Sequence, residues 1–239
     1  MMNVTNKSVL WFSGGKDSLA CLYLMREHWG TFKILHVDTE AKLPEVDEFI
    51  HDLAASVPEF HIIKSDQPAW VQSHGLPVDV LPVMYSGFGH YMRKGNDLKL
   101  QPFVTCCENN LWKPMSQVTK AMGAKTVFHG TRKADAIGNQ HIIDSMVDGI
   151  RYISPIADWS DEDVNQFLSS CGESIPEWYS VVKHDTSMDC WNCTAFMREA
   201  DGRIGWLRDR HPEKHKAFMF SVNTIRSAIK SESEVYERI

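Results

Sequence analysis

The most constraining feature of this sequence is a glycine-containing loop between a short apolar run and an amphipathic pattern. Residues 8–12 are typical of a buried strand, and the pattern predicts a helix over 17–28. Between them, residues 13–18 read Ser-Gly-Gly-Lys-Asp-Ser, with the glycines at Gly14 and Gly15. Such a unit commonly presents backbone N–H groups and a helix N-terminus to phosphate oxygens. We therefore expect an anion-binding loop, against the plainer alternative of an ordinary strand-to-helix turn.

The remaining residues of this loop have chemistry that suits a phosphate group. The two glycines let the backbone approach an anion closely, and Lys16 adds a point charge. Ser13 and Ser18 supply hydroxyl donors, and Asp17 is placed either to hold a metal ion or to cap the helix. The spacing differs from that of a Walker loop, which separates its first glycine from Gly-Lys by four residues.

The first two thirds of the chain alternate strand and helix patterns. Further strands are expected over 32–37, 60–63, 126–129 and 150–153, and further helices over 44–56, over 114–122 and after Ser160, where Asp163 completes a capping box. Loops and short helices are expected over 68–102. This alternation predicts an α/β fold with a doubly wound, mostly parallel sheet, which binds ligands outside the carboxyl ends of its strands. We expect one domain over 1–196 and a basic, helical C-terminal extension over 197–239.

Composition excludes several other classes of protein. The chain has 239 residues, of which 43% are hydrophobic and 23% charged, and its formal net charge is −6. These values exclude disordered, collagen-like and strongly nucleic-acid-coating chains. Six cysteines are too few for a disulfide scaffold, and no signal peptide or membrane span is visible. We therefore expect a cytoplasmic protein without membrane contact, in which clustered cysteines are metal ligands or redox groups.

Four of the cysteines form a CC…CxxC pattern: Cys106, Cys107, Cys190 and Cys193. Four thiolates suit an iron–sulfur cluster or a tetrahedral zinc site, although adjacent cysteines are awkward for zinc. The alternative is four unrelated buried thiols. Cys21 and Cys171 fall in or beside predicted helices, and we expect them to be core or surface residues rather than ligands.

Basic residues gather near the end of the sequence. Residues 198–230 contain eight Lys or Arg and four Asp or Glu. A solvated helical face explains this charge, and contact with nucleic-acid phosphates is the alternative. The candidates for phosphate contact are Arg198, Arg203, Arg208, Arg210, Lys214 and Lys216.

The 13–18 loop resembles the pyrophosphate loop of the N-type ATP pyrophosphatases, which cleave ATP between its α and β phosphates. Segments 36–40 (His-Val-Asp-Thr-Glu), 129–135 (His-Gly-Thr-Arg-Lys-Ala-Asp) and 154–159 (Ser-Pro-Ile-Ala-Asp-Trp) resemble the phosphoadenosine phosphosulfate reductase-like branch. The resemblance spans about residues 8–196 and implies an adenine nucleotide alpha hydrolase-like fold that binds ATP and Mg²⁺. It implies that the nucleotide is contacted by the loop residues and by Asp38, Thr39, Glu40 and Arg132, with Asp38 as a Mg²⁺ or ribose partner and Arg132 as a phosphate clamp.

The cysteine pattern resembles the [4Fe-4S] ligand set of the assimilatory adenylylsulfate reductases, and residues 175–185 resemble the segment that precedes its second half. Two features depart from those reductases. The loop is a full Ser-Gly-Gly-Lys-Asp-Ser, and no cysteine follows Cys193, where the reductases carry a nucleophilic Glu-Cys-Gly. An intact ATP loop combined with a cluster resembles ATP-dependent sulfur-insertion enzymes. These include tRNA thiolases and the ATP pyrophosphatase component of DNA phosphorothioation systems.

The sequence thus predicts an ATP pyrophosphatase with a [4Fe-4S] cluster. It would adenylate an oxygen, expected to be on a DNA backbone phosphate, for replacement by sulfur from a cysteine desulfurase. Lys16, Asp17 and Arg132 are the predicted catalytic residues. The alternatives are a phosphoadenosine phosphosulfate or adenylyl sulfate reductase and a non-catalytic nucleotide-sensing subunit.

Overall fold

A computed structural model describes residues 3–87, 89, 98–134, 143–173, 175–181, 188–198 and 200–237. Its contacts divide the chain into two compact units. Unit 1 comprises Met1–Asp38, Leu43–Lys64 and Lys113–Tyr179, and unit 2 comprises Thr39–Lys42, Ser65–Trp112 and Ser180–Ile239. The boundary expected at 196/197 does not coincide with this division, because the segment Ser65–Trp112 belongs with the C-terminal helices.

Unit 1 contains a six-stranded sheet in the order β3-β2-β1-β6-β8-β7. Its strands are β1 (Ser8–Trp11), β2 (Lys33–Asp38), β3 (Phe60–Lys64), β6 (Thr126–Phe128), β7 (Asp144–Val147) and β8 (Ile150–Ile153). All neighbouring strands are parallel except β7, which pairs antiparallel with β8. The predicted mostly parallel α/β sheet is confirmed. The sequence pattern missed β7 because this edge strand is largely exposed and has no apolar face.

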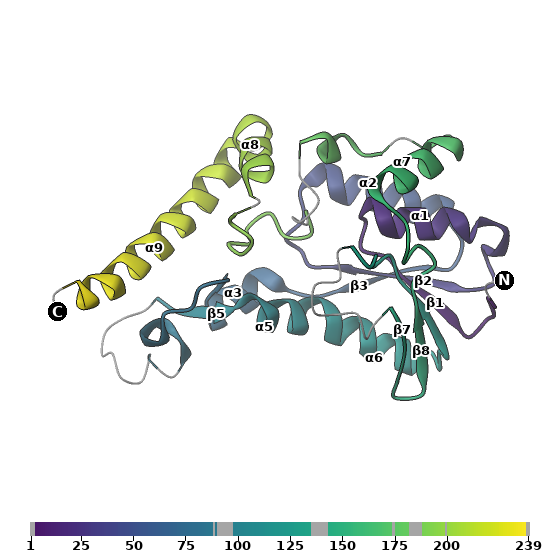
Figure 1. The fold of residues 1–239 in the computed structure, drawn as a ribbon, viewed down its shortest axis with the longest axis horizontal. Helices are drawn as coiled ribbons and strands as arrows, with labels where there is room; N and C mark the ends of the chain where they lie inside the picture. The colour runs from purple at the N-terminus through teal and green to yellow at the C-terminus, as the bar shows by residue number, and fades with distance from the viewer. Residues whose placement is uncertain are drawn as a thin grey trace. The chain divides into compact units, whose positions relative to one another are not determined.

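Helices cover both faces of this sheet (Figure 1). Helices α1 (Lys16–Leu24), α2 (Pro44–Ser56) and α7 (Asp161–Ser170) lie on one face, and α6 (Lys113–Ala121) lies on the other. The helix expected over 17–28 is shorter than predicted, since α1 ends at Leu24 and a 3-10 turn, η1 (Arg26–His28), follows. The capping box at the start of α7 is present: the Ser160 hydroxyl accepts from the Asp163 N–H, and the Asp163 carboxylate accepts from the Ser160 N–H.

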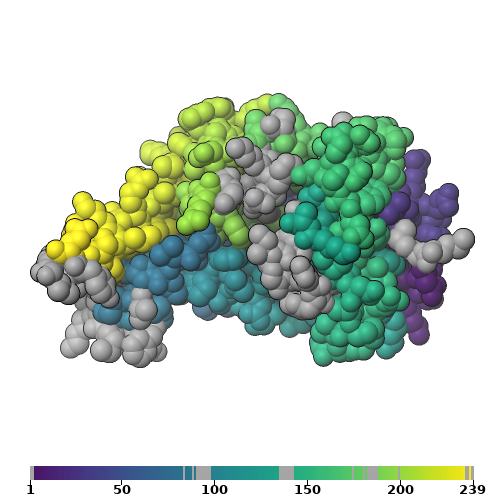
Figure 2. All heavy atoms as spheres, viewed as in Figure 1, coloured from purple at the N-terminus to yellow at the C-terminus, as the bar shows by residue number. Residues whose placement is uncertain are grey.

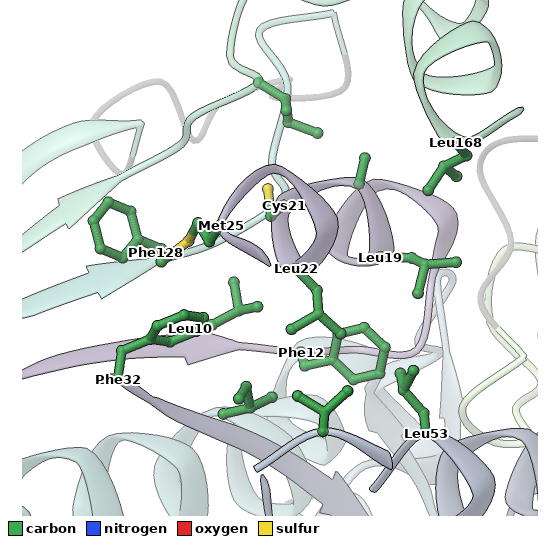
Figure 3. Packing of buried hydrophobic residues seen from close by; sticks show 14 of the residues in the cluster. Leu10, Phe12, Leu19, Cys21, Leu22, Met25, Phe32, Leu53, Phe128 and Leu168 are labelled. Carbon is green, nitrogen blue, oxygen red and sulfur yellow. The ribbon is translucent and has the colours of Figure 1, made fainter. Parts of the chain in front are cut away.

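The main core of unit 1 lies between the sheet and α1 (Figure 3). Leu10 and Phe12 pack beneath Leu19 and Leu22 of α1, and all four side chains are buried. On the opposite face, the Trp11 indole N–H donates to the Thr119 hydroxyl of α6 at 2.9 Å. The two packed faces hold the parallel strands in register, so their carboxyl ends share one edge of the sheet.

Unit 2 is built from shorter elements and a long C-terminal helix. They are α3 (Gln67–His74), β4 (Leu76–Val78), η2 (Val83–Tyr85), β5 (Leu100–Pro102), α5 (Phe103–Cys107), the π-helical turn η3 (Glu108–Trp112), α8 (Asp201–Arg210) and α9 (Pro212–Tyr236). Strands β4 and β5 form a separate parallel pair where only loops and short helices were expected. Their residues Val78 and Leu100 share a core with Ile225 and Ala228 of α9. No helix in the described ranges has the length and apolarity needed to cross a bilayer.

Gly130, in the loop after β6, fixes the distance between two segments of unit 1. A Cβ atom at this position would lie 2.7 Å from the carbonyl carbon of Asp17 and 2.7 Å from the backbone nitrogen of Ser18. Both atoms belong to the first turn of α1, which cannot shift independently of the helix. A glycine is therefore required for the two loops to meet.

Gly130→Ala is expected to lower the free energy of unfolding by about 1–3 kcal/mol, because the methyl group forces the two backbones apart. Chemical denaturation followed by tryptophan fluorescence measures this change. Gly205→Ala in α8 is the matched control, since the nearest side-chain atom to its Cβ, the Arg208 Nη2, would be 3.9 Å away. That control is expected to be neutral or slightly stabilising. Equal stability of Gly130→Ala and the unmodified protein would contradict the proposed close packing.

Candidate nucleotide site and cysteine cluster

The loop at residues 13–18 is held in a tight turn by its own serines. Gly14 has a φ of 88°, a conformation that favours glycine. The Ser13 hydroxyl accepts from the Gly15 N–H at 3.2 Å, and the Ser18 hydroxyl donates to the Gly15 carbonyl at 2.9 Å. The two hydroxyls lie 3.1 Å apart. The two serines that were expected to donate to a phosphate thus also stabilise the conformation of the loop.

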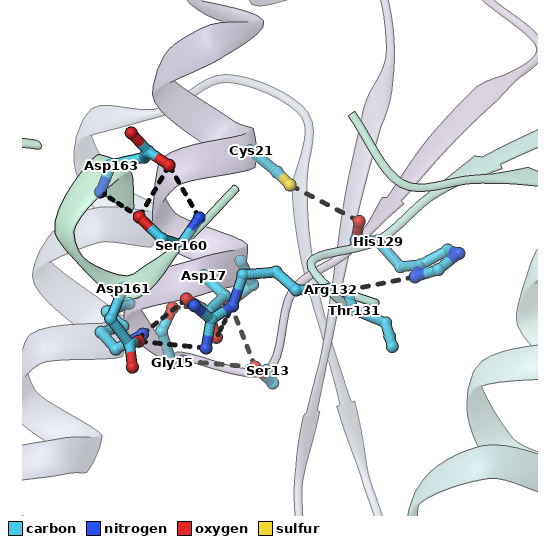
Figure 4. A network of polar contacts seen from close by, with 12 residues as sticks. Ser13, Gly15, Asp17, Cys21, His129, Thr131, Arg132, Ser160, Asp161 and Asp163 are labelled. Atoms are coloured by element: carbon cyan, nitrogen blue, oxygen red, sulfur yellow. Dashed lines mark hydrogen bonds and ion pairs between the residues drawn. The ribbon is translucent and has the colours of Figure 1, made fainter. Parts of the chain in front are cut away.

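Two buried cations converge beside this loop (Figure 4). Lys16 is 6% exposed and Arg132 is 2% exposed. The Lys16 Nζ donates to the Asp17 carboxylate at 2.7 Å, and the Arg132 Nε lies 3.6 Å from the other oxygen of that carboxylate. The N-cap residue of α1 is Gly15, and Asp17 lies within the first turn, so Asp17 is not the cap of this helix. Asp17 instead pairs with both cations.

The same cations share a second carboxylate that the sequence analysis did not select. One oxygen of Asp161 accepts from the Lys16 Nζ at 2.6 Å and lies 3.0 Å from the Arg132 Nη2. Asp161 begins α7, and the loop before it follows β8. Its place after a strand at the ligand-binding edge was the signal that could have identified it.

Tyr179 is a second residue that the sequence analysis missed. The Lys16 backbone N–H donates to the Tyr179 hydroxyl at 3.2 Å. Tyr179 lies in the 3-10 turn η5 (Glu177–Ser180), far from the loop in sequence. No spacing rule connects the two segments, so only the folded structure reveals this contact.

The predicted acidic segment is divided between the two units. Asp38 ends β2 in unit 1, whereas Thr39 and Glu40 belong to unit 2. The Thr39 hydroxyl donates to the Asp189 carbonyl at 2.8 Å and accepts from the Cys190 thiol at 3.5 Å. Glu40 is exposed and has a φ of 57°, which is unusual for a residue other than glycine. The contacts of Thr39 thus connect it to the cysteine segment, and its predicted contact with a nucleotide stays a prediction.

The four cysteines of the CC…CxxC pattern all belong to unit 2, and their charges influence one another. Burial raises the pKa of Cys106 to about 11 and that of Cys107 to about 12, and negative charge on Cys193 adds to both shifts. Burial also raises the pKa of Cys190 well above its ordinary value, despite the Thr39 hydrogen bond that lowers it. Charge on Cys193 and Cys106 raises the pKa of Cys190 further. Cysteines from two distant parts of the sequence therefore belong to one compact unit.

Buried amides surround the first half of this cysteine set. The Asn110 amide nitrogen lies 3.7 Å from the Cys106 sulfur, and that of Gln67 lies 4.0 Å from it. The side-chain amide of Asn192, within the CxxC segment, donates to the side-chain oxygen Oε1 of Gln67 at 3.0 Å. Cys106 and Cys107 end α5 immediately before the π-helical turn η3, a type of distortion common at functional sites.

The described residues include no group of three or more His, Cys, Asp or Glu side chains placed to hold a single metal ion. An iron–sulfur cluster is held by cysteine thiolates, and N–H donors directed at a ligand sulfur are one of the features that tune such clusters. The predicted role of the four cysteines as metal or cluster ligands stays a prediction.

The remaining two cysteines belong to unit 1. Cys21 is fully buried in α1, and its thiol contacts the His129 carbonyl at 3.5 Å. Burial raises the pKa of Cys21 far above its ordinary value, and the charge on Asp17 adds to the shift. Cys171 is the half-buried C-cap of α7. Their predicted locations are confirmed, and Cys21 is unsuited to nucleophilic chemistry.

One arginine of the basic segment, residues 198–230, is buried, contrary to the prediction. Arg203 is 1% exposed and donates to the Ala195 carbonyl at 3.1 Å, with its guanidinium over the Phe218 ring. Its predicted contact with nucleic-acid phosphates is wrong, because a buried side chain cannot reach them. The Lys214 Nζ lies 4.8 Å from the centroid of the Trp191 ring, and Lys216 is exposed. Figure 2 shows much of α9 at the molecular surface.

Parts of the family-like segments lie outside the described residues, namely Asp135 and residues 182–185. Phosphoadenosine 5'-phosphosulfate reductase from Yersinia pseudotuberculosis is 26% identical over 180 residues, covering 74% of this chain and 67% of the relative. The enzyme of the same name from Proteus mirabilis is 23% identical over 169 residues, covering 70% of this chain and 63% of the relative.

A solved structure has a similar fold. The crystal structure of phosphoadenylyl-sulfate (PAPS) reductase from Candida auris, in complex with phosphate, gives a TM-score of 0.52 at 17% identity. The similarity covers 74% of this chain and 79% of that chain. The family model for the phosphoadenosine phosphosulfate reductase domain matches residues 7–196. This chain therefore belongs to the phosphoadenosine phosphosulfate reductase domain family.

Proposed function

We propose that this protein cleaves ATP between the α and β phosphates and transfers the adenylyl group to an acceptor oxygen. The observation that best supports this proposal is the pair of buried cations, Lys16 and Arg132, beside the loop that begins α1. Both cations are paired with the Asp17 and Asp161 carboxylates, and a ligand with several negative charges would offer oxygens that replace the contacts to Asp161. A nucleoside triphosphate has this character.

The reaction follows from the same charges. The acceptor oxygen attacks the α phosphorus, the bond from that phosphorus to the bridging oxygen breaks, and pyrophosphate leaves with the added negative charge. Lys16 and Arg132 stabilise this charge because they are fixed in position and shielded from water. The Asp38 carboxylate, at the end of β2, would hold Mg²⁺, which neutralises phosphate charge when it is bound.

We further propose that Cys106, Cys107, Cys190 and Cys193 hold a [4Fe-4S] cluster. The proposal is supported by their common unit, by the mutual influence of their charges and by the amide donors near Cys106. When bound, the cluster would supply one-electron redox chemistry. The Gln67 and Asn110 amides would then stabilise the charge on the Cys106 thiolate.

The proposed acceptor is a DNA backbone phosphate. After adenylation, the terminal sulfur of a cysteine desulfurase persulfide would attack the acceptor phosphorus, and AMP would leave with the original oxygen. A thiol reductant would then supply two electrons to cleave the remaining S–S bond, which leaves the sulfur on the acceptor and releases the desulfurase cysteine as a thiol. The exposed basic side chains Arg198 and Lys216 are candidates for contact with the DNA backbone. Because the chain as a whole is acidic, this contact is expected to need partner proteins.

The second candidate function is reduction of phosphoadenosine phosphosulfate, which is favoured by the names of the relatives. Such a reaction forms a covalent bond between sulfur and a reactive thiol. Of the two thiols outside the proposed cluster, Cys21 is buried with a raised pKa, and Cys171 terminates a helix. Cys21 lacks the exposure of a reactive cysteine, and Cys171 follows a helix rather than lying on a mobile terminus, so we rank this function second.

ATP with Mg²⁺ is expected to give AMP and pyrophosphate, and Lys16→Ala should lower the rate of pyrophosphate release about a hundredfold. Quantifying AMP, ADP and pyrophosphate by chromatography measures this. Lys120→Ala is the matched control, because Lys120 makes its ion pair with Asp148 at an exposed position. Formation of ADP and phosphate would show that the protein cleaves ATP between the β and γ phosphates, which would contradict the proposal. Sulfite formation from phosphoadenosine phosphosulfate and thioredoxin, dependent on Cys21 or Cys171, would favour the second candidate.

Anaerobically purified protein is expected to be brown and to contain about four irons per chain. Cys→Ser substitution at any of positions 106, 107, 190 and 193 should remove the colour, since each thiolate is a proposed ligand. Cys171→Ser serves as the matched control and should retain both colour and iron. Iron analysis and visible absorption provide the measurements. Stoichiometric zinc instead of iron in the anaerobic preparation would overturn the cluster assignment.

A further inference from the structure

The cations beside the loop are already bound by oxygen atoms of the protein itself. A single oxygen of Asp161 contacts both the Lys16 Nζ, at 2.6 Å, and the Arg132 Nη2, at 3.0 Å (Figure 4). An oxygen shared between a lysine and an arginine is the arrangement that a phosphate oxygen adopts in an anion site. Asp161 therefore occupies the place of a ligand.

A backbone N–H group of the loop is also hydrogen-bonded to an oxygen atom of the protein. The Lys16 N–H, at the start of α1, donates to the Tyr179 hydroxyl at 3.2 Å. That hydroxyl oxygen would lie 3.1 Å from a Cβ atom at Gly15, so it rests directly against the glycine turn. N–H groups at this position of a helix are the usual donors to phosphate. Two different protein oxygens thus satisfy the donors expected to meet a nucleotide.

Asp161 can be displaced without disrupting its helix. Its side chain is 36% exposed, whereas those of Lys16 and Arg132 are 7% and 3% exposed. The N-terminus of α7 is capped by Ser160 and Asp163, which bond to each other's backbone N–H groups. Rotation of the Asp161 side chain toward water would leave this cap intact. The cations would keep their contacts with Asp17, and the place of the Asp161 oxygen would be open to another anion.

We propose that Asp161 is an internal competitor for the terminal phosphates of the nucleotide and determines which anions can enter the site. This inference rests on the proposed nucleotide function of the loop. Together with Asp17, this carboxylate neutralises two buried cations, which lowers the cost of keeping them in place. A ligand binds only if its contacts exceed those of Asp161, because a competing internal state weakens apparent affinity. Competition from the Asp161 carboxylate therefore favours the binding of polyphosphates over that of singly charged anions.

The test is calorimetric titration with inorganic pyrophosphate, which requires no chemical reaction. Asp161→Asn should bind pyrophosphate about five- to tenfold more tightly than the unmodified protein, since the neutral amide competes poorly for the cations. Glu162→Gln is the matched control: it removes one carboxylate from the same helical turn, and its contact is with Gln166. This variant should bind with unchanged affinity. The rise in melting temperature with pyrophosphate should likewise be largest for Asp161→Asn.

Unchanged or weaker pyrophosphate binding by Asp161→Asn would overturn the inference, and so would an absence of binding in both proteins. An equal gain in Glu162→Gln would also overturn it, because general loss of negative charge would then explain the effect. A different result would contradict the proposed pyrophosphatase function without contradicting the role of Asp161. If Asp161→Asn binds pyrophosphate more tightly while ATP yields no AMP, the competitor role stands and the pyrophosphatase assignment does not.

Discussion

Two buried positive charges impose the central constraint on unit 1. Lys16 and Arg132 come from different loops, and the close approach of Gly130 to the first turn of α1 brings those loops together. Cations removed from water must be neutralised, and Asp17 and Asp161 do this in the free protein. The serine-braced turn, the glycine contact and the start of α7 all contribute to holding these four charged groups in one place.

The elements with strong local signals were predictable from sequence. The parallel strands of unit 1, helix α2 and the Ser160–Asp163 cap follow from apolar periodicity and capping chemistry. The glycine turn between β1 and α1 was also predictable, because Gly-Gly-Lys between a strand and a helix is a local pattern. Arg132 was identified through the resemblance of segment 129–135 to the phosphoadenosine phosphosulfate reductase-like branch. Each of these depends on neighbours within a few residues.

Features that depend on distant contacts escaped the sequence analysis. Asp161 and Tyr179 contact Lys16 from far along the chain, and no periodicity connects them to it. The burial of Arg203 was missed because charge composition cannot distinguish a solvated arginine from one packed on Phe218. The two-unit division was missed for a related reason, since Ser65–Trp112 joins α9 through a core formed by remote residues.

The most direct test of the account is a crystal structure of the protein with Mg²⁺ and an ATP analogue that resists cleavage between the α and β phosphates. The account predicts that oxygens of the β and γ phosphates contact Lys16 and Arg132, that the Gly14–Gly15 turn lies against the phosphate chain, and that the Asp161 carboxylate has left both cations. Phosphates bound away from these two cations, with Asp161 still between them, would contradict it.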